Sequence, residues 1–162
     1  MGQVDGKVAI VTGSGRGIGQ QIALRLVRDG AKIVINDIDE APAKETIALI
    51  EKMGGKAVAC VGDVSKPDFG DRIVKTALDA FGDCHIIVNN AGYTWDSVIQ
   101  KMTDEQWYAI IDVHMTAPFR ILRAFANHLR AAHEKETAAG KRIVRKVVNI
   151  SSTSGEIGRA HV

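Results

Sequence analysis

The stretch KVAIVTGSGRGIGQQIALRLVRDGAKIVIND, which runs from Lys7 to Asp37, decides the fold of this chain. Its apolar run Val8–Val11 predicts a buried strand that ends in the glycine-rich loop TGSGRGIG. Apolar residues then recur at helical spacing, and a second apolar run, Lys32–Ile35, predicts the next strand. A glycine fingerprint indicates a ligand site only in this order of strand, glycine loop, helix and strand.

The chemistry of this loop favours an anionic ligand. Glycine lets the backbone turn tightly and approach a pyrophosphate, and the free N–H groups at the start of a helix attract the anion. Asp37 follows Gly19 by 18 residues, at the end of the second strand, where a carboxylate can accept hydrogen bonds from ribose hydroxyls. The glycines alone would also suit an ordinary turn, whereas strand, helix and acid together predict a dinucleotide site.

The remaining sequence continues the alternation of strands and helices. We expect strands over Lys56–Val61, His85–Val88 and Val144–Ile150, and helices over Glu40–Met53, Lys66–Phe81, Thr103–Ile111 and Pro118–His133. Ser65 is the expected N-cap of the helix that begins at Lys66. Because right-handed crossovers leave few other topologies, this alternation predicts the α/β class with one doubly wound parallel sheet. We expect residues 1–162 to form a single dinucleotide-binding domain.

In a doubly wound sheet, ligands bind outside the carboxyl ends of the strands. The loops at those ends carry glycine and polar residues, namely Gly13–Gly19, Asp37, Asp63, Asn90–Gly92 and Ser152. The sequence therefore predicts one site at this edge, built from segments that lie far apart in the chain. Asp63 is also compatible with a turn or a helix cap, and Ser152 with an ordinary turn serine.

The composition is that of an ordinary globular protein. The chain has 162 residues, of which 46% are hydrophobic and 25% charged, and its formal net charge is +2. No apolar stretch approaches the length of a membrane span, and the first residues lack an apolar signal region. We therefore expect a soluble, cytoplasmic protein without a membrane partner.

Two further features of the sequence do not indicate a ligand site. A basic run near the end of the chain is interpreted as a solvated loop and not as a nucleic-acid site, since no aromatic residue interleaves with it. Its members are Lys135, Lys141, Arg142, Arg145 and Lys146. Cys60 and Cys84 have neither metal-ligand spacing nor a CxxC pair, so we expect buried free thiols and no metal.

Three motifs follow one another along the chain: TGSGRGIG at Thr12–Gly19, NNAG at Asn89–Gly92 and SxxG at Ser152–Gly155. In this order they resemble the short-chain dehydrogenase/reductase family, and the resemblance extends from about Asp5 to Gly155. It implies a Rossmann sheet with strand order 3-2-1-4-5, whose C-terminal strands we expect to be missing from these 162 residues. The segments GYTWD and KMTDEQW are most similar to the 3-oxoacyl-thioester reductases.

The resemblance implies a role for each motif in an oxidoreductase that transfers a hydride between a nicotinamide cofactor and a ketone or secondary alcohol. The glycine loop would hold the pyrophosphate, Asp63 and Val64 would flank the adenine, and NNAG would line the middle of the cofactor. Ser152 would donate a hydrogen bond to the substrate carbonyl oxygen. The implied cofactor residues are Gly13, Ser14, Arg16, Gly17, Ile18, Gly19, Asp37, Asp63, Val64, Asn90, Ala91 and Gly92.

Two features depart from the family pattern. His114 stands where the family usually has an asparagine that holds a water in a proton relay, so it is either part of such a relay or a packed helix histidine. The family's general acid is a tyrosine, followed four residues later by a lysine, and it would fall about thirteen residues after Ser152, past Val162. We therefore expect an incomplete enzyme that is inactive alone; the alternative is a nucleotide-binding fragment without catalysis.

Asp37 and Arg16 favour different cofactors. Asp37 would repel a 2′-phosphate, whereas Arg16 beside the glycines would pair with it. Since Asp37 occupies the ribose position, we expect NAD, with NADP as the alternative. The resemblance also implies a small-molecule carbonyl or alcohol substrate, and a homodimer or homotetramer assembled through the helix expected at about Thr116–His133.

Overall fold

The first unit of the sequence folds as its apolar pattern predicts. In the computed structural model, which describes residues 2–152, β1 is Val8–Val11, α1 is Gly17–Arg28 and β2 is Lys32–Ile35. All four residues of β1 are buried, and α1 buries the face that carries Ala23 and Val27. The glycine-rich loop connects the carboxyl end of β1 to the start of α1.

The later elements keep the alternation of helix and strand. They are α2 Glu40–Lys52, β3 Ala57–Ala59, α3 Phe69–Phe81, β4 Ile86–Asn89, α4 Asp104–Ile111, α5 Ala117–Ala138 and β5 Lys146–Asn149. A short 3₁₀ turn, Ile99–Lys101, precedes α4, and a π-helical turn, Asp112–Thr116, joins α4 to α5. The expected α/β class is confirmed.

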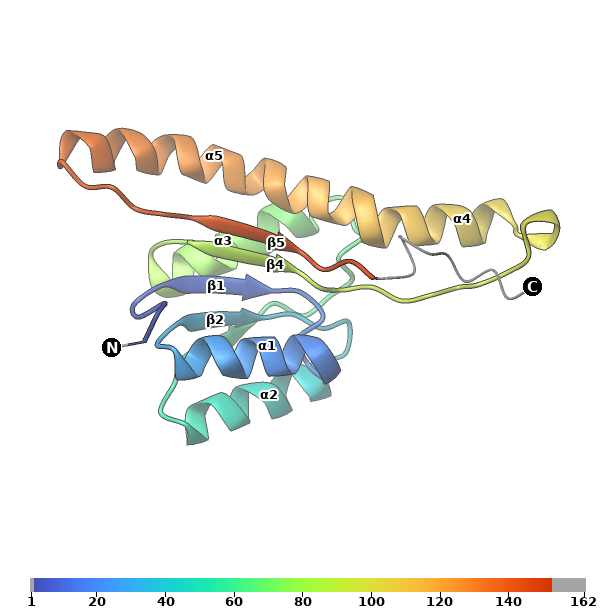
Figure 1. Cartoon of the computed structure of the whole chain (residues 1–162), viewed down its shortest axis with the longest axis horizontal. Helices are drawn as coiled ribbons and strands as arrows, with labels where there is room; N and C mark the ends of the chain where they lie inside the picture. Colours follow the sequence, from blue (N-terminus) through green and yellow to red (C-terminus); the bar gives the residue numbers. More distant parts are fainter. Residues whose placement is uncertain (1, 153–162) are drawn as a thin grey trace.

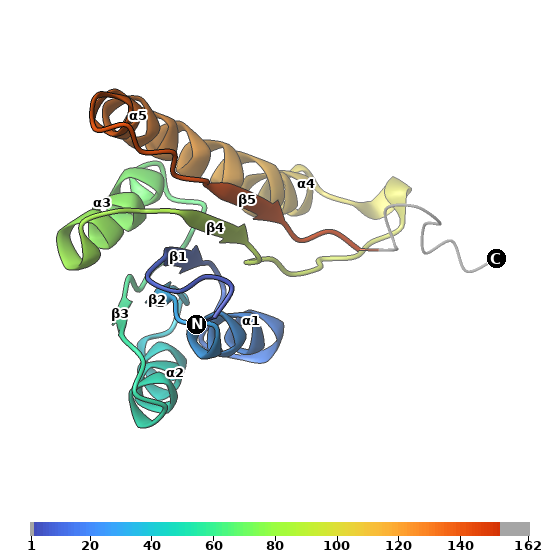
Figure 2. The same cartoon turned by 60° about the vertical axis from the view of Figure 1, so that its left-hand side comes forward.

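The strands form one parallel sheet in the order β3-β2-β1-β4-β5 (Figure 1). This confirms the predicted order 3-2-1-4-5. Helices α1 and α2 cover one face of the sheet, while α3 and α5 cover the other (Figure 1, Figure 2). The direction of strand addition reverses between β1 and β4, and doubly wound sheets bind their ligands beside such a reversal.

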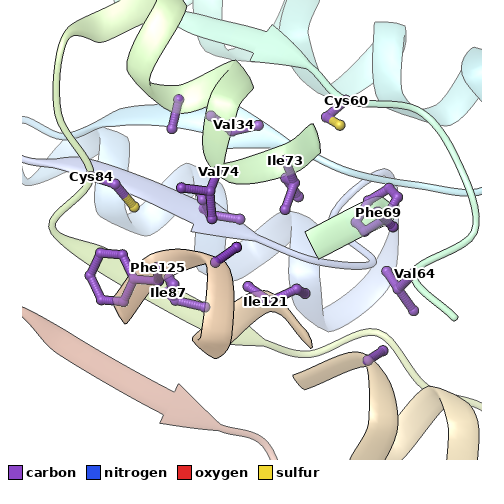
Figure 3. Close-up of a cluster of buried hydrophobic side chains, with 14 of the residues drawn as sticks. Val34, Cys60, Val64, Phe69, Ile73, Val74, Cys84, Ile87, Ile121 and Phe125 are labelled. Carbon is purple, nitrogen blue, oxygen red and sulfur yellow. The ribbon is translucent and has the colours of Figure 1, made fainter. Parts of the chain in front are cut away.

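Two apolar cores lie on opposite faces of the sheet because successive residues of a strand point to opposite sides. Ile87 of β4 packs with α3 and α5, in a core that contains the fully buried rings of Phe69 and Phe125 (Figure 3). The next residue, Val88, packs with α1 and α2 on the other face. This double coverage explains why the predicted strands have continuous apolar runs and not alternating ones.

Several boundaries differ from the sequence-based expectation. Strands β3 and β5 are shorter than predicted, because only Ala57–Ala59 and Lys146–Asn149 pair with a neighbouring strand. Helix α3 begins at Phe69, and Ser65 donates its hydroxyl to Asp63 at 2.7 Å. The prediction that Ser65 caps this helix was therefore wrong, since a turn separates Ser65 from the first helical residue.

Helix α4, the π-helical turn and α5 form one continuous run over residues 104–138, where the sequence predicted two helices. Thr103 starts the run with a capping box, in which its hydroxyl and its N–H bond the backbone and side chain of Gln106. Pro118 has no N–H for the carbonyl of His114, and the π-helical turn just before it accommodates the missing bond. Within residues 2–152, no helix combines the length and apolar character that crossing a bilayer requires.

One member of the expected solvated basic run has a largely enclosed side chain instead. Arg145 is 9% exposed and contacts Asp83 and Glu136 at the amino edge of the sheet, at 3.0 and 2.6 Å. Its Nε donates to the carbonyl of Cys84 at 3.1 Å, so the burial of the guanidinium is compensated. Lys135 also departs from the expectation, because it lies in α5 and not in a loop. Both cysteines are buried free thiols, as predicted.

Candidate functional site

A pocket of about 460 Å³ lies at the carboxyl edge of the sheet, where the loops after β1, β2, β3 and β4 meet. Most of the residues that the sequence predicted to bind the cofactor line it, namely Gly13, Arg16, Asp37, Asp63, Val64, Asn90, Ala91 and Gly92. The other lining residues had no predicted role in binding; they are Asn36, Ile38, Gly62, Tyr93 and Val113. The structure thus brings the predicted segments together.

The glycine loop leaves no room for side chains at Gly13 and Gly19. An added Cβ at Gly13 would lie 2.9 Å from the Cα of Ala91, and Gly13 also has a left-handed backbone, with φ of 61°. An added Cβ at Gly19 would overlap the carbonyl oxygen of Gly13 and lie 2.5 Å from Nδ2 of Asn90. Glycine at both positions therefore lets the loop sit directly on α1 and on the segment after β4.

The start of α1 is suited to an anion. The helix begins at Gly17, and its N-cap residue Arg16 makes no side-chain bond to the helix. The first turn contains no acidic residue, so the positive end of the helix dipole is not neutralised there. Gly17 and the 70% exposed Ile18 lie on the outer side of this turn, where they line a shallow hollow beside the pocket.

Asn36 is a pocket residue to which the sequence analysis gave no role. It is buried at the end of β2, and its Oδ1 accepts from the N–H of Gly13 at 3.2 Å. Its Nδ2 donates to the carbonyls of Cys60 and Gly62, both at 3.0 Å. Asn36 therefore ties the glycine loop to the segment after β3. The available signal was an amide at the end of an apolar strand, because a buried amide requires hydrogen-bond partners.

Thr12 and Asn90 tie the other side of the loop to β4. The hydroxyl of Thr12 accepts from the N–H groups of Asn90 and Ala91, both at 3.0 Å. In return, Nδ2 of Asn90 donates to the carbonyls of Thr12 and Gly13 at 3.0 and 3.1 Å. Asn90 thus joins the ends of β1 and β4 while it also lines the pocket.

Ser14 does not line the pocket, because its side chain turns into the protein. Its hydroxyl donates to the carbonyl of Val11 at 2.6 Å and accepts from the N–H of Asn36 at 3.1 Å. The residue is fully buried. Its side chain therefore holds the loop against β2, so that any contact of Ser14 with a ligand would be made through its backbone.

Three charged groups meet at the end of the pocket formed by β2. Asp37, which is largely buried, lies 3.6 Å from the guanidinium of Arg16 and accepts from the N–H of Asp39 at 3.2 Å. Arg16 makes a closer ion pair with Asp39, at 2.6 Å. The hydrogen bond to Asp39 and the charge of Asp37 raise the pKa of Arg16 above its ordinary value. The pocket therefore presents one cation that is already shared between two carboxylates.

Asp63 lies at the opposite wall of the pocket in a tight turn. Its Oδ1 accepts from the N–H and the hydroxyl of Ser65, at 2.8 and 2.7 Å. Partial burial raises the pKa of Asp63, but these two bonds and the nearby Lys66 outweigh it, so the pKa lies below its ordinary value. Oδ2 lies 3.7 Å from Lys66. The geometry confirms the turn role and leaves the carboxylate at the pocket wall.

His114 lies in the π-helical turn and contacts the loop after β4. Its Nε2 is 2.9 Å from the carbonyl oxygen of Tyr93, which fixes Nε2 as the donor if the ring is neutral. An added Cβ at Gly92 would overlap the ring of His114, so glycine is required for this contact. π-helical turns are frequent at functional sites. The residue is exposed, so its ring is not packed in the interior of the protein.

Ser152, the predicted substrate-binding hydroxyl, lies just beyond β5 and is exposed. Its neighbour Ser151 and His114 line one hollow of about 850 Å³ between β5 and α5. Apolar side chains of Met115, Phe119 and Ile150 line the same hollow. The two predicted catalytic positions are therefore placed at the carboxyl edge, next to the pocket. Gly155, the last residue of the third motif, lies outside the described residues.

The pocket fits a dinucleotide. Glycines allow close approach of the backbone, α1 offers the free N–H groups of its first turn, and Asp37 offers acceptor oxygens at the end of β2. These are the three recognition elements that a pyrophosphate and an adenosine ribose require. Among the described residues, no group of three or more histidines, cysteines or acidic residues is arranged to hold a metal ion.

Comparison with known proteins agrees with this geometry. The model of the short chain dehydrogenase family matches residues 7–162. The chain is 38% identical to hydroxyacyl-CoA dehydrogenase ChsB1 of Mycobacterium tuberculosis, over 96% of the chain and 50% of that protein. It is 35% identical to a 3-oxoacyl-[acyl-carrier-protein] reductase of Synechocystis, over 94% of the chain and 58% of that protein. Glucose 1-dehydrogenase 2 of Bacillus subtilis is 38% identical to it, over 95% of the chain and 57% of that protein.

A solved structure extends the likeness to three dimensions. It is a metagenomic short-chain oxidoreductase in complex with NADP, with a TM-score of 0.82 and 34% identity over 94% of this chain and 65% of that one. The chain spans about half the length of the curated relatives that it matches. The family model covers nearly all residues of the chain, and the strand order of the sheet is the one that the family resemblance implies. The chain belongs to the short-chain dehydrogenase family.

Proposed function

We propose that the protein is an oxidoreductase that binds a nicotinamide dinucleotide at the carboxyl edge of its sheet. The observation that carries the proposal is the pocket of about 460 Å³, in which the glycine loop, the NNAG motif and the segments after β2 and β3 meet. The first turn of α1 would hold the pyrophosphate, and Asp63 and Val64 would flank the adenine. A bound nicotinamide dinucleotide supplies or accepts the hydride of the reaction.

NAD is the proposed cofactor. The carboxylate of Asp37 would accept hydrogen bonds from both ribose hydroxyls, and a 2′-phosphate would meet its charge at short range. The relative with bound NADP shows that this family also accommodates the 2′-phosphate. In this chain, however, Arg16 at that end of the pocket is paired with two acids.

Ser152 and His114 are the proposed catalytic residues. The hydroxyl of Ser152 would donate to the carbonyl oxygen of a ketone, which stabilises the negative charge that develops there as the hydride arrives. His114 would hold a water of the proton relay that serves the resulting alkoxide, since Nε2 donates to the Tyr93 carbonyl and Nδ1 can accept a hydrogen bond from that water. His114 lines the hollow between β5 and α5, and Ser152 directly follows Ser151 of the same lining.

The proposed substrate is a 3-oxoacyl thioester. Two relatives are named for acyl-thioester reactions, while a third is named for glucose. The test uses a version of the protein that is extended through the family's tyrosine and lysine, because we expect residues 1–162 alone to be inactive. It measures the oxidation of NADH with a panel that contains acetoacetyl-CoA, a simple ketone and, for the reverse reaction with NAD, glucose. We expect turnover with the thioester and a loss of about 100-fold or more in Ser152→Ala. Ser97→Ala, a matched control in the loop after β4, should retain activity.

Two results would contradict this assignment in different ways. Tight binding of NADH without turnover of any member of the panel would favour a nucleotide-binding protein without catalysis. Equal turnover by Ser152→Ala and the parent protein would remove the serine from the mechanism while leaving the oxidoreductase activity in place.

We further propose that the protein forms a homodimer or homotetramer through the helical run of α4 and α5. Large apolar side chains of this run are between 53% and 65% exposed, namely Trp107, Tyr108, Met115 and Phe119. Exposed apolar patches of this kind are typical of protein interfaces. Light scattering should give a mass of at least two chains, and a mass of one chain would contradict the proposal.

A further inference from the structure

Asp39 uses its carboxylate in an unusual way for its place in the fold. It is the N-cap residue of α2, where an aspartate ordinarily accepts a hydrogen bond from an N–H of the first helical turn. Here the side chain makes no such bond to the helix. Instead, its Oδ2 lies 2.6 Å from Nη2 of Arg16 across the mouth of the pocket.

Arg16 is the sole lysine, arginine or histidine among the residues that line the pocket in the described part of the chain. The acids that line the same pocket are Asp37 and Asp63. A ligand that carries an additional phosphate at this end would therefore depend on Arg16 for its compensating charge. The pairing of Arg16 with Asp39 withholds that charge.

We propose that Asp39 is a specificity-determining residue, which selects against a 2′-phosphorylated cofactor by holding the guanidinium of Arg16. This inference rests on the proposed dinucleotide function and assigns to Asp39 a role separate from that of Asp37. Asp37 lines the pocket and would face the ribose, whereas Asp39 lies outside the lining and would act through Arg16. A 2′-phosphate would have to break the 2.6 Å ion pair and also approach two carboxylates.

The test is to measure binding of NADH and NADPH to Asp39→Asn by fluorescence titration and calorimetry at fixed ionic strength. Asparagine has nearly the same shape and is a good N-cap residue, so α2 should remain intact. We expect NADPH to bind about fivefold more tightly than it binds the parent protein, because an exposed ion pair and one repulsive charge are removed. The affinity for NADH should stay within twofold of the parent value.

Glu40→Gln is the matched control. Glu40 is the next acid in the chain, is similarly exposed and pairs with Lys44 at 2.8 Å, so its replacement removes the same net charge without touching Arg16. This variant should leave the ratio of the two affinities unchanged. In the double variant Arg16→Gln with Asp39→Asn, the gain in NADPH affinity should disappear, because the released cation is no longer present.

The outcomes separate this inference from the proposed function. If the parent protein binds NADH and Asp39→Asn gains no more NADPH affinity than Glu40→Gln, the role of Asp39 is overturned while the dinucleotide site stands. A gain that persists in the double variant would also overturn it, since Arg16 would not carry the effect. Binding of neither cofactor by the parent protein would overturn the proposed function and this inference with it.

Discussion

At the amino edge of the sheet, the side chain of Arg145 is 9% exposed and that of Glu136 is 13% exposed, whereas at the carboxyl edge those of Arg16 and Asp39 are 63% and 62% exposed. Both pairs have the same separation, 2.6 Å. The amino-edge pair is enclosed by further partners, while the carboxyl-edge pair lies at the mouth of a pocket. The enclosed pair at the amino edge therefore stabilises the fold, whereas the exposed pair at the carboxyl edge remains accessible to a ligand.

The amino-edge cluster consists of five side chains that satisfy one another. Asp83 is its centre and contacts His128 at 2.8 Å, Arg145 at 3.0 Å and His85 at 3.3 Å. Burial raises the pKa of Asp83, but the bonds from His128 and Arg145 outweigh it and hold the pKa below its ordinary value. Because these partners come from α5 and from the segments that lead into β4 and β5, the cluster fastens β5 and α5 to the rest of the sheet.

Removal of the central cation should produce the largest change in stability. In Arg145→Met, the carboxylates of Asp83 and Glu136 lose their shared partner inside a poorly hydrated site. We expect the free energy of unfolding to fall by about 3 kcal/mol, the range in which breaking a buried ion pair falls. Urea unfolding followed by circular dichroism would measure this change.

Arg142→Met provides the control for Arg145→Met, since Arg142 lies in the same connection but is exposed. It should change the stability by less than about 0.5 kcal/mol. The folded fraction of Arg145→Met should still bind the dinucleotide with unchanged affinity, because the cluster lies at the edge opposite the pocket. Equal effects of the two substitutions would show that burial of Arg145 does not distinguish the two edges.

The next largest effect is expected at the carboxyl edge and on binding. In Gly19→Ala, the new methyl group would overlap the carbonyl of Gly13 and displace the loop from α1. A displacement of this size should weaken dinucleotide binding by about 100-fold. A calorimetric titration with NADH would measure it, and an affinity within threefold of the parent value would contradict the close approach described for this loop.

Gly54→Ala tests a glycine at the amino edge of the sheet, for comparison with Gly19→Ala at the carboxyl edge. Gly54 has a left-handed backbone with φ of 76°, but no atom would contact an added Cβ within 4 Å. The substitution should therefore cost about 1 kcal/mol in stability through backbone strain and leave the affinity for NADH unchanged. Substitution of Gly19 would then affect dinucleotide binding, whereas substitution of Gly54 would affect only the stability of the fold.

The same contrast explains what the sequence could and could not predict. The strands and the glycine loop depend on local patterns, since apolar runs mark buried strands and Gly13 and Gly19 follow the first of them closely. The order of the strands came from the family resemblance and not from these patterns. Arg145 was assigned to a solvated loop because its neighbours in sequence are charged. Its partner Asp83 is 62 residues away, and no local pattern contains that distance.

The contacts of Asn36 and His114 could not be predicted, for the same physical reason. The amide of Asn36 is satisfied by the carbonyl of Cys60, 24 residues further on, and this bond exists only after β3 pairs with β2. The position of His114 depends on a π-helical turn, in which one additional residue rotates the following side chains relative to an α-helix. The periodicity of apolar residues predicts the helices on both sides but not this irregular turn.

His85 gives the smallest predicted effect and extends the contrast to pH. Its Nδ1 accepts from the N–H of Val8 at 3.1 Å, so protonation of this atom would break a bond at the start of β1. Burial lowers the pKa of His85; Asp83 opposes this shift, Lys7 and Arg145 add to it, and Glu136 opposes it weakly. The net pKa lies below the ordinary value of about 6.5.

The sign of the pH effect follows from this shift. Below about pH 6.5 the unfolded chain takes up a proton that the folded protein resists, so the free energy of unfolding should fall as the pH is lowered. For one group the slope cannot exceed about 1.4 kcal/mol per pH unit. In His85→Asn, the amide oxygen can accept the Val8 N–H without titrating, and the fall between about pH 7 and pH 5 should become shallower. Urea unfolding at several pH values in this range would measure the slope of the free energy of unfolding for the parent protein and for His85→Asn. Equal slopes would show that a group other than His85 titrates.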